Sequence, residues 1–183
     1  MKRAAALAVA ALVAWLALPP PRDANAVNFT VTCTASSTTL LFNNYEPLSG
    51  LPTTTPAGTI NVTCVGSGIN ASVSPVTVSY NLQLATTPAR RLTSPGGDQL
   101  NYDVCVNNPP YPTCNPWDMT GNLIAGSLQL TTANQDTGVT VNHAYYGVIA
   151  PSQDDPAGTY SEAGRGITLN WSCSPAPTGK GTC

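Results

Sequence analysis

Apolar and polar residues alternate with a period of two along most of the chain. The longest such run is Val76–Leu84, in which every second residue is apolar. Because a β-strand sends successive side chains to opposite faces, this pattern predicts a strand with one buried and one solvated face. Similar runs are Phe29–Cys33, Ile60–Cys64, Leu128–Leu130, Val139–Val141 and Ile167–Cys173, while Leu100–Val106 and Ala144–Ile149 have a broader apolar character.

Turn-forming residues separate these runs. Leu51–Gly58 is rich in Pro and Thr, and both Ser94–Asp98 and Asp154–Gly158 combine Pro, Gly and Asp as tight turns do. After Ala26, no segment has the 3.6-residue period of an amphipathic helix. Many strands separated by turns predict an all-β domain built as an antiparallel β-sandwich.

The first 26 residues have the layout of a secretory signal peptide. Lys2 and Arg3 precede the apolar run Ala4–Leu18, and Ala24–Ala26 offers a small-x-small cleavage site. The apolar run is shorter than the roughly 20 residues of a membrane span. We therefore expect a signal peptide over residues 1–26, a domain over residues 27–173 and a polar tail over residues 174–183, with no membrane span after signal removal.

The expected exported chain carries little charge. Four basic and eight acidic residues follow residue 26, which gives a net charge of −4. Nucleic-acid binding is excluded as a function, because it needs clustered Lys and Arg. Thr, Ser, Asn and Gln cover the polar faces instead. Such a surface has few charges to oppose strand-to-strand association.

Six cysteines follow the export signal, so disulfides are the expected state. The spacing alone does not fix their connectivity. We favour three bridges between residues that bracket a loop, lie in predicted strands or flank the tail: Cys105 with Cys114, Cys33 with Cys64, and Cys173 with Cys183. The alternative leaves Cys183 free or paired between chains.

Patterns that carry catalytic or metal chemistry are weak. The chain has one histidine, His143, in a predicted strand, and it has neither a G-x-S-x-G elbow nor a Cys-x-x-Cys pair. Asp154 and Asp155 favour local turn hydrogen bonds over calcium binding. Arg90 and Arg91 favour a solvated strand end over a grip on a partner's carboxylate. We therefore expect no enzymatic activity, no cofactor and no metal.

One loop region is a candidate surface contact, formed by Trp117, Met119, Leu123 and Ile124. Trp117 is either a platform for a sugar ring or a hydrophobic lid. The lid is favoured, because tryptophan usually buries most of its area. If these side chains are exposed, they are the contact patch of a lectin-like adhesin.

Several short sequence segments form a characteristic pattern through their order and spacing along the chain. These are Cys33 followed by Leu41–Pro47, Gly58–Cys64, Val78–Leu84, Arg91-Leu92 followed by Leu100–Val104, Trp117-Asp118, and Tyr146–Ile149 followed by Gln153, Gly158 and Tyr160. Together, between Val31 and Cys173, they resemble the spore coat protein U domain family, which includes subunits of archaic chaperone–usher pili.

The resemblance implies an immunoglobulin-like sandwich that lacks its last strand and is completed by a donor strand. It implies a Cys33–Cys64 bridge and a groove whose rim holds Ile167, Leu169 and Trp171. The implied partners are a periplasmic chaperone, an outer-membrane usher and other pilus subunits. The implied location, reached through the periplasm, is the cell surface, a pilus, or a spore or cyst coat.

Three departures from the family pattern refine this expectation. If cleavage follows Ala26, only Val27–Thr32 precede Cys33, too few residues for both a first strand and a free donor arm. Cys105–Cys114 is an additional bridge, and the tail to Cys183 is expected to cover part of the groove. We therefore predict a tip or end subunit that supports adhesion or biofilm formation. The alternatives are a lectin-like adhesin and a non-polymerised spore or cyst coat protein.

Overall fold

The computed structural model describes residues 28–84, 90–106, 113–117, 123–161, 166–178 and 181–183, so the expected signal peptide lies outside the described residues. Within them the chain is all-β and antiparallel, which confirms the predicted fold class. The strands are β1 (Thr30–Ser37), β2 (Leu41–Tyr45), β3 (Thr53–Thr54), β4 (Gly58–Ser67), β5 (Val76–Leu84), β6 (Arg91–Thr93), β7 (Gln99–Asn101), β8 (Asp103–Cys105), β9 (Ile124–Leu130), β10 (Val139–Ile149), β11 (Gly158–Ser161) and β12 (Ile167–Ser174).

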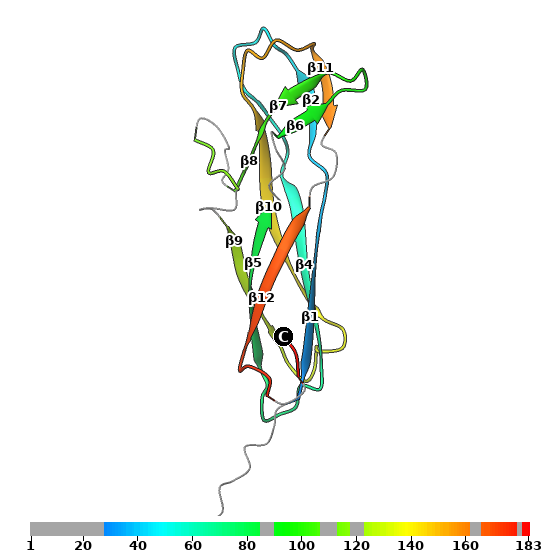
Figure 1. The fold of residues 1–183 in the computed structure, drawn as a ribbon, viewed down its shortest axis with the longest axis vertical. Helices are drawn as coiled ribbons and strands as arrows, with labels where there is room; N and C mark the ends of the chain where they lie inside the picture. Colours follow the sequence, from blue (N-terminus) through cyan, green and yellow to red (C-terminus); the bar gives the residue numbers. More distant parts are fainter. Residues whose placement is uncertain (1–27, 85–89, 107–112, 118–122, 162–165, 179–180) are drawn as a thin grey trace, which may run out of the picture.

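Two sheets face each other along an elongated shaft (Figure 1). One sheet has the order β1-β4-β10, and the short strands β3 and β8 also pair with β10. The other sheet has the order β12-β5-β9. A third sheet, β2-β11-β6-β7, lies at the upper end of the shaft in Figure 1.

The core follows the alternation in the sequence. In β5 and β4, the central strands of the two shaft sheets, alternate residues are buried and point at each other's sheet. The buried members of β5 are Val76, Val78, Tyr80, Leu82 and Leu84, and those of β4 include Ile60, Val62 and Cys64. At the upper end the core continues through Phe42, Tyr45, Leu92, Leu100 and Tyr160.

Strand β10 joins two runs that the sequence pattern separated, Val139–Val141 and Ala144–Ile149. Its first half is half-buried at alternate positions, whereas its last residues are almost continuously buried. The reason is the third sheet, which covers this end. Phe42 of β2 packs so closely on Gly147 that an added side chain there would collide with the ring.

The predicted strand Leu100–Val106 is instead two short strands. β7 pairs with β6 in the third sheet, and β8 pairs with β10 in the first. The chain changes sheets at Tyr102, whose N–H donates to the carbonyl of Arg90 at 3.1 Å. The prediction of strand structure in this run is therefore confirmed, but the prediction of one continuous strand is wrong, because the two halves belong to different sheets.

All six cysteines are paired. The bridges are Cys33–Cys64, Cys105–Cys114 and Cys173–Cys183, which is the pairing that the sequence analysis favoured. The first joins directly opposite residues of β1 and β4. It therefore fastens an edge strand to its neighbour within one sheet.

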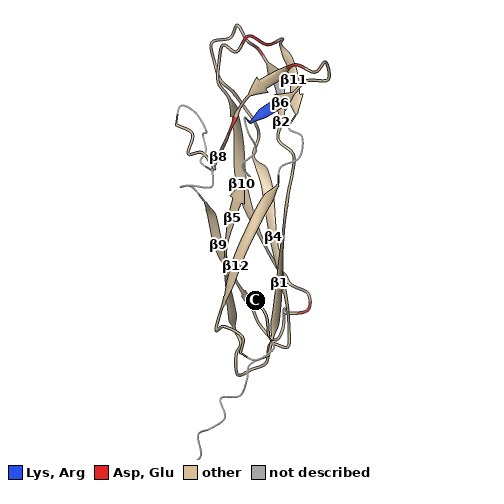
Figure 2. Cartoon of the chain, in the orientation of Figure 1, with Lys and Arg blue, Asp and Glu red and all other residues tan. Residues whose placement is uncertain are grey.

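The shaft is almost free of charge. None of the six long strands β1, β4, β5, β9, β10 and β12 contains Asp, Glu, Lys or Arg. Figure 2 shows the charged residues at the upper end and in a loop near the lower end, with the shaft strands uncoloured. Threonines face outward instead, and Thr63 and Thr140 share a hydrogen bond of 2.8 Å across β4 and β10.

Candidate functional site

The two edge strands β1 and β12 leave the sandwich open along one side. Within the described residues, the strands that pair with these edges are β4 for β1 and β5 for β12, and β1 has one further bridge, between Thr30 and Thr182. The two edges lie side by side on the front of the shaft in Figure 1, in contact but without strand pairing between them. We call this region, between Thr30–Ser37 and Ile167–Ser174, the β1–β12 seam.

The inner face of β12 is only partly covered. Ile167, Leu169 and Trp171 pack against the core, yet each remains half-buried. Their partners on β5 are fully buried, as Leu82 opposite Leu169 and Tyr80 opposite Trp171 show. Burial therefore falls from the centre of this sheet toward the seam. The three residues named from the sequence as groove-rim residues lie on this inner face.

The main chain of β1 also faces the seam. Cys33 and Cys64 have Cα atoms 4.1 Å apart, the short separation of an antiparallel pair that exchanges no hydrogen bonds. In such a pair the N–H and C=O of Cys33 point away from β4. Residues two apart along a strand point the same way, so those of Ala35 also face the seam. These are the groups with which an added strand would pair.

Trp171 adds an unsatisfied donor to the seam strand. Its indole Nε1 is buried and has no hydrogen-bond partner in the part of the chain that the structure describes. Leaving a buried donor unpaired costs about 1–3 kcal/mol. An acceptor brought by another polypeptide would remove this cost.

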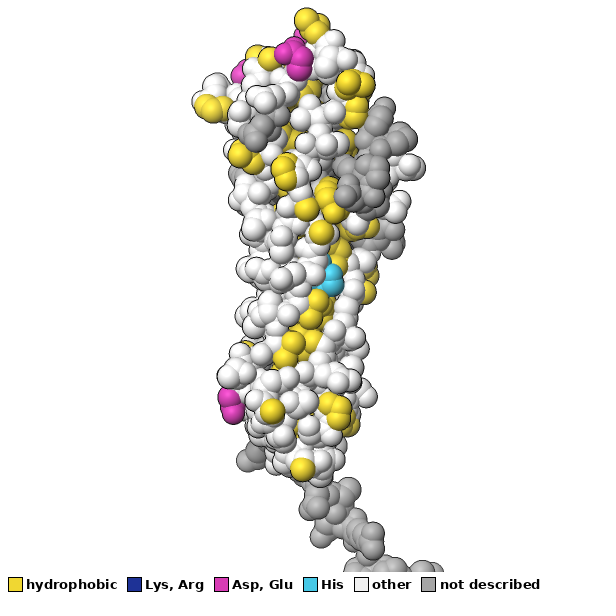
Figure 3. Space-filling view, turned by 180° about the vertical axis from the view of Figure 1, so that it is seen from behind, with side chains coloured by type: hydrophobic (Ala, Val, Ile, Leu, Met, Phe, Trp, Pro, Cys, Tyr) yellow, Lys and Arg dark blue, Asp and Glu magenta, His cyan; other side chains and the backbone are white. Residues whose placement is uncertain are grey.

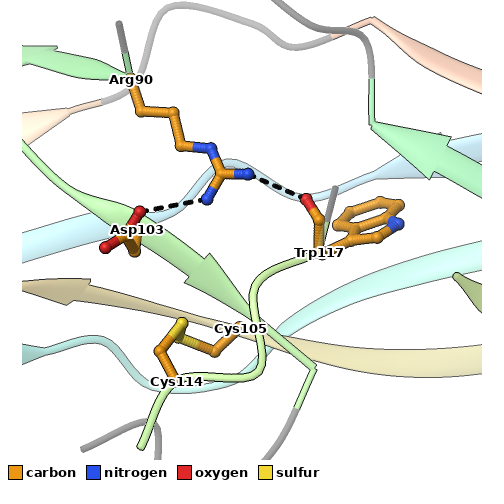
Figure 4. A network of polar contacts seen from close by, with 5 residues as sticks. All are labelled: Arg90, Asp103, Cys105, Cys114 and Trp117. Carbon is orange, nitrogen blue, oxygen red and sulfur yellow. Dashed lines mark hydrogen bonds and ion pairs between the residues drawn. A yellow bond between two sulfur atoms is a disulfide. The ribbon is translucent and has the colours of Figure 1, made fainter. Parts of the chain in front are cut away.

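Trp117 sits in a fixed network beside the end of β8 (Figure 4). Its ring is 1% exposed, and Nε1 donates to the carbonyl of Leu82 at 3.0 Å. Arg90 donates to the Trp117 carbonyl at 3.0 Å and forms an ion pair of 3.2 Å with Asp103. The Cys105–Cys114 bridge holds the preceding segment next to this network. Arg90 is thus engaged within the chain rather than left as a solvated strand end.

Three of the four residues of the candidate contact loop lie within the described part of the chain. Trp117 and Ile124 are both buried, so neither side chain has the exposure that the lectin-like alternative requires. Leu123 is 39% exposed, and Met119 lies outside the described residues. The lid interpretation of Trp117 agrees with its burial.

The sequence of this chain was compared with those of known protein families. Residues 23–163 match the family described as the Spore Coat Protein U domain. The chain belongs to this family. The Spore Coat Protein U domain is a family of structural subunits of surface fibres and coats. The match contains β1 to β11 and ends before β12, so β12 and the tail lie outside it. No curated protein matches the chain.

The opposite side of this Spore Coat Protein U domain has a second seam, between β9 and the first half of β10. Figure 3 shows a narrow strip of apolar side chains running lengthwise past the one histidine, drawn in cyan. There His143 Nε2 and the Tyr80 hydroxyl lie 2.8 Å apart, which links the two shaft sheets. Burial lowers the pKa of His143 and raises the pKa of Tyr80.

Neither a metal centre nor a membrane helix is found in the described ranges. There, no three His, Cys, Asp or Glu side chains gather closely enough to hold a metal ion. The same ranges contain no helix long and apolar enough to cross a membrane. The β1–β12 seam, in contrast, leaves main-chain groups of β1 and half-buried side chains of β12 uncovered together.

Proposed function

We propose that this chain is an exported structural subunit of a bacterial surface fibre or coat, and that a strand from another polypeptide completes its sandwich. The observation that carries the proposal is the β1–β12 seam. It combines a main-chain edge of β1 that no strand pairs with beyond Val31 and a half-covered apolar face on β12. An unpaired edge of this kind associates with other strands unless something pairs with it.

Strand addition fits the chemistry of the seam. Main-chain groups of the donor strand would pair with those of Cys33 and Ala35, and alternate donor side chains would cover Leu169 and Trp171. Family membership supports the identity of the donors. A periplasmic chaperone would supply the strand first and another subunit afterward, with assembly at an outer-membrane usher.

A matched pair of charge substitutions tests this proposal. Leu169 faces the seam and Thr168 faces solvent on the same strand. Leu169→Asp should lower the amount of tagged protein sheared from the surface of expressing cells by more than about tenfold, because an unpaired charge would be buried under the donor strand. Thr168→Asp should leave it unchanged.

The melting temperature of the two purified variants is the control for folding. Each variant should melt as a folded domain, since position 169 is half-exposed before assembly. Normal surface assembly of Leu169→Asp would exclude the seam as the assembly site.

The position in the assembly depends on the residues before β1. Phe29 is already buried and β1 begins at Thr30. If export removes residues 1–26, no free segment remains to donate to a neighbour, so we propose a tip or end subunit. N-terminal sequencing of the surface protein should give Val27. A start far enough upstream to leave a separate strand ahead of Thr30 would instead support a rod subunit.

A further inference from the structure

We propose that the end of the tail, residues 181–183, forms the first segment of the missing strand and thereby fixes where a partner strand begins in the seam. The inference has two parts. The first, that the tail pairs with β1 as a strand would, concerns this chain alone. The second, that the tail sets where a partner strand begins, rests on the proposed function.

The tail pairs with the free edge of β1. Thr182 N–H donates to the carbonyl of Phe29 at 3.1 Å, and Val31 N–H donates to the carbonyl of Thr182 at 3.0 Å. The resulting bridge between Thr30 and Thr182 is parallel. The tail therefore occupies the edge position next to β1 at the lower end of the seam.

The direction of the tail is that of a strand filling the seam. In Figure 1, β1 runs upward and β12 runs downward, and the C-terminus lies between them at the lower end. A segment parallel to β1 is thus antiparallel to β12. A strand inserted between these two edges in the same direction would continue the line of the tail.

Both edges of the seam hold the tail in place. The Cys173–Cys183 bridge ties its end covalently to β12. On the other side, Gly181 approaches β1 so closely that an added Cβ would lie 2.6 Å from the Phe29 carbonyl oxygen. Any larger residue at position 181 would push the tail away from β1.

The tail therefore divides the β1 edge into a filled and an open part. The carbonyl of Phe29 and the N–H of Val31 are bonded to Thr182, whereas the main-chain groups of Cys33 and Ala35 face the open seam. The remaining edge, Thr32–Ser37, is as long as a strand of about six residues. The partner that fits is a short extended segment with alternating apolar side chains, parallel to β1, whose N-terminal end meets the tail.

Two variants release the tail, and one controls for the loss of a disulfide. The double variant Cys173→Ser/Cys183→Ser opens the clamp. Cys105→Ser/Cys114→Ser is its matched control, since the two bridges span 10 and 9 residues. Gly181→Val is a second release variant that keeps the disulfide.

The probes are two blocked synthetic peptides of alternating Thr and Val, one of about six residues and one of about ten. The parent and the control should bind both peptides equally, because the tail stops the longer one at Cys33. Both release variants should bind the longer peptide about tenfold more tightly than the shorter. Amide exchange at Val31, measured by NMR without peptide, should be slow in the parent and fast in both release variants.

Each half of the inference fails separately. Equal Val31 exchange in the parent and both release variants would overturn the strand-like role of the tail. A parent that prefers the longer peptide as strongly as the release variants do would overturn its role as a stop. If no protein binds either peptide while Val31 stays protected in the parent, the proposed function fails and the pairing of the tail with β1 stands.

Discussion

At the scale of single residues, the contact between Tyr80 and His143 is the clearest polar link between the two shaft sheets. It joins β5 to β10 along the apolar strip of the second seam, and the two rings meet edge to face with centroids 5.7 Å apart. The sequence could not indicate this pair, because 63 residues separate its members and each stands in an unremarkable alternating run.

The burial of His143 predicts a dependence of stability on pH. Its pKa in the folded chain lies below the ordinary value of 6.5, so the unfolded chain takes up a proton first as the pH falls. The free energy of unfolding should be constant above about pH 7 and should decrease as the pH is lowered through about 6.5 toward the folded-state pKa. Urea unfolding at a series of pH values above about 5 measures this effect before most carboxylates titrate.

The variant His143→Gln is the control for this dependence. It keeps a hydrogen-bonding side chain next to Tyr80 but removes the titrating group. Its unfolding free energy should be flat over the same pH range. A parent whose stability is also flat there would show that His143 is not shielded from solvent in the folded chain.

At the scale of elements, the three disulfides play different parts. Cys33–Cys64 fastens the edge strand β1 to β4, Cys105–Cys114 closes a loop beside Trp117, and Cys173–Cys183 holds the tail. Only the first spans a long stretch of chain, with a separation of 31 residues against 9 for the second.

Loop length predicts how much each bridge stabilises the fold. In the chain-entropy account, removing Cys33–Cys64 with paired serines should cost about 4 kcal/mol, and removing Cys105–Cys114 about 3 kcal/mol. Urea unfolding of the two double variants checks the order of these values. An equal or reversed order would mean that contacts around Cys105, rather than loop closure, set the cost.

The sequence predicted at least part of each long shaft strand, whereas it missed several short strands and merged two others into one. Val76–Leu84 and Ile167–Cys173 alternate over enough residues to identify β5 and most of β12. By contrast, β6 and β11 have three and four residues, too few for a period to be recognised, and β7 was predicted only as part of the longer run Leu100–Val106. These three strands are held by pairing with one another and with β2. The position of Trp117 likewise involves a residue distant in sequence, because its indole N–H donates a hydrogen bond to the carbonyl of Leu82. No local pattern indicates such a contact.

At the scale of the whole molecule, the described part of the sandwich has two unpaired sides, the β1–β12 seam and the second seam between β9 and β10. The half-buried residues Ile167, Leu169 and Trp171 were identified from the sequence by their period and by the family resemblance. The pairing of Thr182 with β1 was beyond sequence reasoning, because no local pattern marks a two-bond contact between a polar tail and a strand edge. A comparison restricted to the matched family region would also miss it, since that region ends at residue 163.

The charge-free shaft has a consequence for survival outside the cell. Proteases of trypsin-like specificity cut after Lys or Arg, and residues 27–183 offer them only Arg90, Arg91, Arg165 and Lys180. None of these stands in a shaft strand. The lack of charge that leaves the strands free to associate therefore also leaves the shaft strands without a cleavage site for such proteases.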